Sequence, residues 1–189
     1  MSVRHYFVFA LALIAAFVPL TAQPNEALWS ELSKSGHVVL MRHAVTTPGA
    51  GDPPGMRLDD CSTQRNLTEH GRQHARRIGD EFRARRISVD RVMSSPWCRC
   101  IETARLAFGK AEVWQPLSNL FGRSENEAKQ VTQLRAFVSQ PRSASAVLVT
   151  HGSTIAALTG ISAGTGEMVV VAPEGDGKFA VRGRLSVGP

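Results

Sequence analysis

The sequence predicts an α/β fold with three layers, α/β/α, around a mostly parallel central sheet. Short apolar runs typical of buried strands, such as residues 37–42 and 146–151, alternate with amphipathic helical segments. Strands that alternate with helices imply parallel pairing with helices on both faces of the sheet. The chain has 189 residues, 43% of them hydrophobic, which suffices for one domain with a substantial core and is short for two.

The first 22 residues are predicted to be a signal peptide outside the fold. Arg4 and His5 precede an uninterrupted apolar run over residues 6–20, and small residues end it near Ala22. The run is short for a membrane span, which needs about 20 apolar residues, although an uncleaved anchor is the alternative. We therefore expect a periplasmic or secreted protein without a stable membrane anchor after cleavage, and a single domain over residues 23–189.

The first half of that domain predicts a helix, a strand, a loop and a second helix. Residues 25–34 have the amphipathic spacing of a short helix, and residues 37–42 are apolar on both faces, as a buried parallel strand requires. The segment 44–66 is too rich in Pro, Gly and Asp for regular structure, so a long loop is expected. Thr68 can cap the next helix, whose apolar residues repeat at helical spacing through residue 86.

The second half repeats the alternation. Residues 91–94 form the second strand, after which Pro96 starts a helix that ends near residue 108. The pattern SENE at residues 124–127 matches a capping box, with Ser124 as N-cap, and opens a further helix. The other expected elements are strands at 146–151, 168–172 and 179–185, and a short helix ending at Gly160.

Positive charge is concentrated in one part of the sequence. The chain has 22 Lys and Arg against 16 Asp and Glu, and the segment from Arg65 to Arg105 holds much of the excess. Arginine suits phosphate because its planar fork donates two hydrogen bonds at once. A nucleic-acid footprint would need more aromatic residues and is out of place in an exported protein, so no nucleic-acid partner is expected. Most of these Arg should lie on a solvated helix face.

The three cysteines predict one disulfide if the protein is exported. Cys98 and Cys100 face different directions on a helix and are poor partners for each other. The expected bridge therefore joins Cys61 to either Cys98 or Cys100 and leaves one free thiol. Three reduced buried thiols are the alternative.

Four side chains stand at the carboxyl ends of predicted strands, where ligands of such sheets bind. Arg42 and His43 follow the first strand, Arg99 lies just past the second, and His151 closes the third. A dianionic phosphoryl group fits this set, because a neutral imidazole can attack phosphorus while guanidinium groups hold the oxygens and oppose protonation of the imidazole. This chemistry needs no metal and no cofactor.

A metal site elsewhere is not expected. His70 and His74 lie four residues apart on one predicted helix, yet no third ligand accompanies them at suitable spacing. Both histidines should therefore occupy an exposed helix face.

The segments MRHA, SSPWCRCIETA and VTHG, in this order and each at a predicted strand end, resemble the histidine phosphatase superfamily. RNLTEHGRQHA also fits the pattern of that superfamily at the following helix. The resemblance implies a phosphoglycerate mutase-like fold. It implies roles for the four strand-end residues and for Arg65, which lies where the small phosphohistidine phosphatase branch has an extra basic residue. These roles are a nucleophile at His43, a second catalytic histidine at His151, and phosphate ligands at Arg42, Arg65, Arg99 and His151.

Two features depart from that family pattern. Ala44 stands where the superfamily usually has Gly. The carboxyl group that protonates the leaving oxygen in many members has no certain counterpart, and the candidates are Asp52, Glu125, Glu127 or none; the two glutamates also suit a helix start. Without a proton donor, substrates with good leaving groups, such as phosphoramidates or acyl phosphates, are favoured.

The resemblance implies an exported phosphatase, a phosphoric monoester hydrolase that works through phosphohistidine at His43. Its partner would be a small phosphorylated substrate, and compartment and charge point to the sugar phosphates of surface lipopolysaccharide or to small scavenged esters. The alternative is a noncatalytic phosphate or lipid-headgroup binding module of the same fold.

Overall fold

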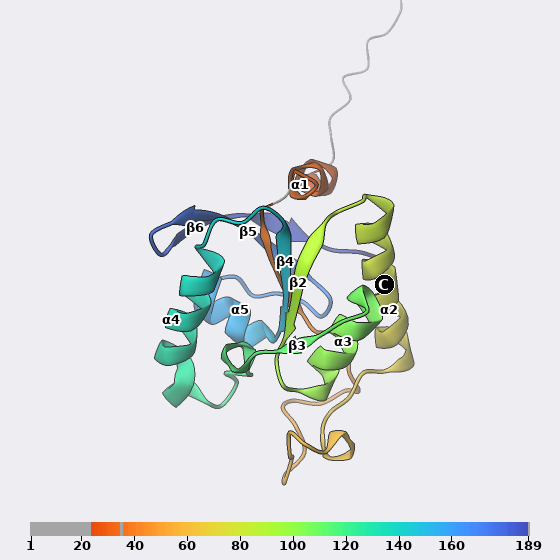
Figure 1. The fold of residues 1–189 in the computed structure, drawn as a ribbon. Helices are drawn as coiled ribbons and strands as arrows, with labels where there is room; N and C mark the ends of the chain where they lie inside the picture. Colours follow the sequence, from red (N-terminus) through yellow and green to blue (C-terminus); the bar gives the residue numbers. More distant parts are fainter. Residues whose placement is uncertain (1–23, 35, 189) are drawn as a thin grey trace, which may run out of the picture.

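The computed structural model describes residues 24–34 and 36–188 (Figure 1). The predicted signal peptide, residues 1–22, lies outside the described residues. The helices are α1 (Pro24–Leu32), α2 (Glu69–Ala84), α3 (Cys98–Phe108), α4 (Glu127–Val138) and α5 (Gly152–Thr159). The strands are β1 (Val38–Arg42), β2 (Val89–Ser94), β3 (Glu112–Val113), β4 (Ser145–Thr150), β5 (Met168–Gly175) and β6 (Lys178–Leu185).

One mixed sheet runs through the domain, with its strands in the order β3-β2-β4-β1-β5-β6. The pairs β1–β4, β2–β4 and β2–β3 are parallel, whereas β5 adds antiparallel to β1 and turns back into β6. The predicted mostly parallel sheet is confirmed. Strand β3 was not predicted, because two exposed residues carry no periodicity.

Helices cover both faces of the sheet, so the three-layer prediction is confirmed (Figure 1). In β1, Val39 and Met41 pack in one core with side chains of α1, α2 and α3. Their neighbours Val38 and Leu40 point the other way, into a second core with α4 and α5. Apolar residues at every position therefore reflect a strand that is buried on both faces.

Glycine lets helix α2 approach its neighbours closely. A Cβ at Gly79 would overlap the Ala107 carbonyl of α3, and one at Gly71 would overlap the Val45 carbonyl. Both glycines lie on the buried side of α2. The position of Gly71 within EHGRQHA is thus explained by backbone packing against the segment that follows β1.

Two local predictions are wrong. Helix α4 starts at Glu127 after a short 3-10 helix, and its N-cap is Asn126, so Glu127 is the first helical residue and does not complete a capping box. His74 is 5% exposed rather than solvated, and its Nε2 lies 3.0 Å from the Val187 carbonyl oxygen. The helical pattern alone missed the C-terminal segment that covers this part of α2.

The basic segment behaves largely as expected of a solvated face. Four of its ten arginines pair with surface carboxylates: Arg72 with Glu102, Arg83 with Asp80, Arg85 with Glu26 and Glu81, and Arg91 with Glu112. These exposed pairs contribute little to stability individually. Within residues 24–34 and 36–188, no helix is both long and apolar enough to cross a bilayer.

Candidate active site

The two histidines meet because β1 and β4 are adjacent parallel strands. Arg42 of β1 pairs in register with Thr150 of β4, and the next backbone N–H, that of His43, donates to the Thr150 carbonyl at 3.0 Å. His151 follows as the N-cap residue of α5. The ring centroids of His43 and His151 lie 5.5 Å apart, so the sheet places both at one spot.

Helix α3 adds a buried guanidinium. Arg99 lies in its first turn and is 1% exposed. Together with Arg65 of the long loop, these residues line a cavity of about 410 Å³ at the carboxyl ends of the strands. We call this set the anion cradle; its members are Arg42, His43, Arg65, Arg99 and His151.

His43 has the tautomer and the charge state of a nucleophile. Its Nδ1 lies 2.8 Å from the Ala44 carbonyl oxygen, which can only accept, so Nδ1 carries the proton and Nε2 keeps its lone pair. Burial, together with the positive charges of Arg99, Arg42 and Arg65, lowers the pKa of His43 to about 3, although the bond to Ala44 opposes the shift. The imidazole is therefore neutral at pH 7.

Ala44 fits where the superfamily usually has glycine. Its side chain is fully buried in a small core with Leu67 and Ala75. Its N–H donates to Thr103 Oγ1 at 3.1 Å, which fixes the peptide between His43 and Ala44. The methyl group thus packs into the protein.

His151 is held by buried partners that the sequence did not single out. Its Nε2 lies 2.8 Å from Ser95 Oγ and 3.5 Å from Cys100 Sγ, and the Trp97 ring packs edge-on at 5.2 Å. Burial, followed by the charges of its neighbours in the cradle, lowers the pKa of His151 well below its usual value. Burial also raises the pKa of the Cys100 thiol to about 12, so this thiol stays protonated.

Asp52 supports Arg99 instead of facing a substrate. Its two carboxylate oxygens accept from the Arg99 guanidinium at 2.6 and 3.2 Å, and it also accepts from the Arg65 backbone N–H and the Trp97 indole N–H. Burial alone would raise the pKa of Asp52, but the hydrogen bonds from Arg99 and Arg65 hold it below its usual value. An ionised carboxylate with four donors is a poor general acid, so this candidate role is not supported.

The two glutamates are not brought to the site either. Glu125 and Glu127 are exposed and lie outside the residues that line the cavity. The Glu125 side chain accepts from Asn126 Nδ2 at 3.1 Å. Of the candidate acids, the structure thus brings Asp52 alone next to the cradle, and in the wrong protonation state.

The cradle arginines have donors to spare. Arg42 donates to the Ala163 carbonyl at 2.9 Å and Arg65 to the Gly49 carbonyl at 2.7 Å, which anchors one end of each guanidinium. The Nε–H groups of Arg42, Arg65 and Arg99 are buried without an acceptor among the described residues. A buried unpaired donor costs about 1–3 kcal/mol, which an anion with several oxygens would offset.

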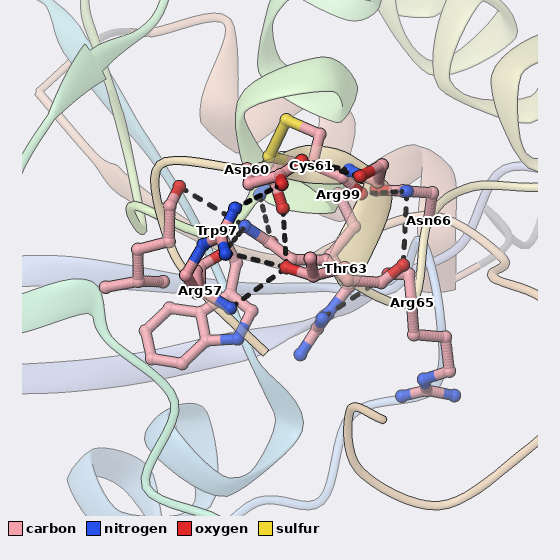
Figure 2. Close-up of a disulfide and its surroundings, with 12 residues drawn as sticks. Arg57, Asp60, Cys61, Thr63, Arg65, Asn66, Trp97 and Arg99 are labelled. Atoms are coloured by element: carbon pink, nitrogen blue, oxygen red, sulfur yellow. Dashed lines mark hydrogen bonds and ion pairs between the residues drawn. A yellow bond between two sulfur atoms is a disulfide. The ribbon is translucent and has the colours of Figure 1, made fainter. Parts of the chain in front are cut away.

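The loop half of the site is fastened by the disulfide (Figure 2). Cys61 is bonded to Cys98 at the start of α3, while Cys100 is free and buried, so the predicted bridge is confirmed and its partner is decided. Asn66 Nδ2 donates to the Cys61 carbonyl at 2.6 Å, next to Arg65. The bridge therefore ties the segment that carries Arg65 to the helix that carries Arg99.

No cluster of three or more metal-ligating side chains occurs among residues 24–34 and 36–188. His70 is exposed on α2 while His74 faces the C-terminal segment. The two histidines thus do not act together.

Residues 38–120 match the family model described as "Histidine phosphatase superfamily (branch 1)". The matched segment includes Arg42, His43, Arg65 and Arg99, and His151 lies beyond it, directly after β4. This match supports the resemblance to the histidine phosphatase superfamily that the sequence motifs indicated. No curated protein sequence is significantly similar to it.

Solved structures agree with this fold. The putative phosphohistidine phosphatase SixA from Agrobacterium tumefaciens is 25% identical, with a TM-score of 0.55 over 81% of this chain and 99% of that one. The protein histidine phosphatase SixA complexed with tungstate is 19% identical, with a TM-score of 0.56 over 79% and 96%. The Entamoeba histolytica phosphoserine phosphatase in complex with 3-phosphoglyceric acid is 15% identical, with a TM-score of 0.60 over 80% and 97%.

Proposed function

We propose that this protein is a phosphatase that hydrolyses phosphate monoesters or related phosphoryl compounds through a covalent phosphohistidine at His43. One observation carries the proposal: a buried, neutral imidazole with a fixed tautomer lies among three arginines and a second histidine. The match of residues 38–120 to the superfamily model and the phosphatases among the structural neighbours support it. The site residues act as follows.

In the first step, the Nε2 lone pair of His43 attacks phosphorus. A P–N bond forms while the bond from phosphorus to the leaving group breaks, and the leaving group departs with the electron pair. Arg42, Arg65 and Arg99 hold the phosphoryl oxygens, whose charge they neutralise in the ground and transition states. Asp52 is a positioning residue that fixes the Arg99 guanidinium through two hydrogen bonds.

His151 donates a hydrogen bond to a phosphoryl oxygen. The hydroxyl of Ser95 is fully buried and lies 2.8 Å from His151 Nε2, and in the proposed arrangement it donates to this nitrogen. The neutral ring then carries its proton on Nδ1, and His151 lines the cavity. Ser95 thereby selects the tautomer that can donate.

In the second step, water attacks the phosphohistidine. The P–N bond breaks, inorganic phosphate leaves, and His43 regains its lone pair. One proton of the water stays on phosphate, and the other is released to solvent. The leaving group takes one proton from solvent, so protons balance over the two steps. Because the described residues bring no protonated carboxyl group to the cavity, leaving groups that depart without protonation are the best substrates.

The compartment is part of the proposal. A basic and apolar N-terminal segment and a disulfide both suit an exported protein, so we infer a periplasmic or secreted enzyme. Its substrate is a small phosphorylated compound, and a sugar phosphate of surface lipopolysaccharide is one candidate.

The test is turnover of 4-nitrophenyl phosphate by the purified protein. Wild type should release phosphate, and His43→Ala should lower kcat by at least about 10⁴-fold while circular dichroism stays unchanged. A rapid acid-free quench should trap a phosphoprotein that is acid-labile and alkali-stable in wild type only. Turnover that survives His43→Ala would contradict the proposal.

The second candidate function is a noncatalytic phosphate or lipid-headgroup binding module. The observation that favours it is the engagement of Asp52 by Arg99, which leaves the cavity without a general acid. Binding of inorganic phosphate without turnover of any aryl or acyl phosphate would establish this module in place of the enzyme.

A further inference from the structure

We propose that the site extends beyond the anion cradle into a distal groove, which binds a second anionic group on the leaving-group side of the substrate. The substrate class is a phosphoryl compound whose leaving group contains a planar ring and, beyond it, a carboxylate or a second phosphate. This inference rests on the proposed function, because it assigns the other end of the same substrate.

Three hollows adjoin one another at this edge of the domain. The cavity of the cradle shares Gly51, Asn119 and Phe121 with a hollow of about 360 Å³. That hollow shares Trp97, Asn119 and Arg123 with a third, of about 370 Å³. The distal groove consists of these two further hollows. Since Asn119 lines all three, a ligand can extend from the cradle to the far end along one surface.

The far end of the distal groove is cationic. Arg123 and Lys129 line it, and neither has a carboxylate partner among the described residues. Asp52 is the one carboxylate among the lining residues, and Arg99 already binds both of its oxygens. A substrate with anionic groups at both ends therefore finds positive charge at both.

An exposed aromatic ring stands between the two ends. Phe121 is 63% exposed, more than any other large hydrophobic side chain described, and its ring lies over the Gly51 turn. The Phe121 N–H donates to Asn119 Oδ1 at 3.1 Å, and Ser153 Oγ donates to the same oxygen at 2.8 Å. Nδ2 of Asn119 is thus left to donate to a ligand. A flat leaving group can cover the Phe121 ring while Asn119 fixes its edge.

Ring contacts bound the span of the substrate. The centroid of His151 is 5.5 Å from that of His43 and 5.2 Å from that of Trp97. The Arg123 guanidinium in turn lies 5.5 Å from the Trp97 ring centroid. The Arg123 guanidinium therefore lies at most three such steps from the ring of His43. A bicyclic leaving group with an acidic side arm is of the size that this limit allows.

The test compares two aryl phosphates that differ in one carboxylate. 4-Methylumbelliferyl phosphate and the phosphate of 7-hydroxycoumarin-4-acetic acid share their ring and their scissile bond. Wild type should prefer the acidic compound in kcat/KM by about tenfold, the range expected for two exposed cations. Arg123→Gln with Lys129→Gln should abolish this preference and leave kcat for 4-methylumbelliferyl phosphate unchanged. Phe121→Ala should raise KM for both compounds.

The matched control is Lys34→Gln with Lys178→Gln, which removes two exposed positive charges outside all three hollows. The control should keep the preference. Equal kcat/KM for the two compounds in wild type, or equal loss in control and groove variants, would overturn the distal groove and leave the phosphatase intact. Absence of turnover with both compounds would overturn the proposed function itself.

Discussion

The two halves of the anion cradle are built differently. Arg42, His43 and His151 stand directly at the ends of adjacent strands, where the register of β1 and β4 fixes them. Arg65, together with Asp52 that lies beside the cradle, belongs to an irregular loop, whose position depends on one disulfide and on side-chain hydrogen bonds. The comparison teaches that the strand half places the reacting groups, whereas the loop half aligns the positive charge around them.

Loss of the disulfide should lower the free energy of unfolding more than the other changes do. It should loosen the loop half of the site and leave the strand half in place. Replacing Cys61 and Cys98 by Ser removes a bridge with a sequence separation of 37. Chain entropy predicts a loss of about 4 kcal/mol in the free energy of unfolding. Urea denaturation measures it, and reductant should destabilise wild type but not the double variant. kcat should fall only a few-fold, because His43 and His151 are held by strands. A loss of kcat comparable to that of His43→Ala would contradict the division into a strand half and a loop half.

Asp52→Asn should have the largest effect on catalysis among changes in the loop half. Loss of the ionised partner frees the Arg99 guanidinium, and a misplaced binding group lowers kcat/KM by about 100-fold. Steady-state kinetics with 4-nitrophenyl phosphate measure the loss. Asp59→Asn, on the exposed part of the same loop, is the control and should change nothing. Full activity of Asp52→Asn would show that Arg99 needs no positioning residue.

Ser95→Ala probes the strand half with a smaller effect. Without the hydroxyl that donates to Nε2, His151 adopts both neutral tautomers, and kcat should fall by about tenfold. The ¹⁵N chemical shifts of the His151 ring report the tautomer directly. Ser94→Ala is the neighbouring buried control, since Ser94 Oγ donates to the Ser95 carbonyl rather than to a histidine. Unchanged ring shifts in Ser95→Ala would remove the role assigned to this hydroxyl.

The smallest expected effect is on the pH dependence of the free energy of unfolding. This dependence should differ between variants of the strand half and variants of the loop half. Burial lowers the pKa of His43 to about 3, so between pH 6 and pH 5 the unfolded chain binds a proton that the folded protein does not. The free energy of unfolding should therefore fall by about 1 kcal/mol from this group as the pH drops by that unit. Asp52, whose pKa is already lowered, contributes only at more acidic pH.

Urea denaturation of His43→Gln and Asp52→Asn at both pH values checks this. His43→Gln should lose part of the dependence and Asp52→Asn should keep all of it. The opposite pattern would place the titrating group in the loop half.

What could be predicted from the sequence follows the same division. An apolar run that ends in Arg42 and His43, and another that ends in His151, suffice to place these residues at one sheet edge, because parallel strands present their carboxyl ends together. The place of Arg99 could also be predicted, because this residue lies in the first turn of the helix that follows the second predicted strand. Asp52 and Ser95 could not be assigned, because their partners are distant in sequence and no local period marks them.

The sequence by itself determined the alternation of strands and helices and the convergence of the two histidines, since hydrophobic periodicity and chain direction are local properties. Tertiary structure alone decided three things: which cysteine pairs with Cys61, which nitrogen of His43 bears its proton, and that Asp52 binds Arg99. Each depends on atoms brought within hydrogen-bonding or bonding distance by packing, and short-range contacts between remote segments have no signature along the chain.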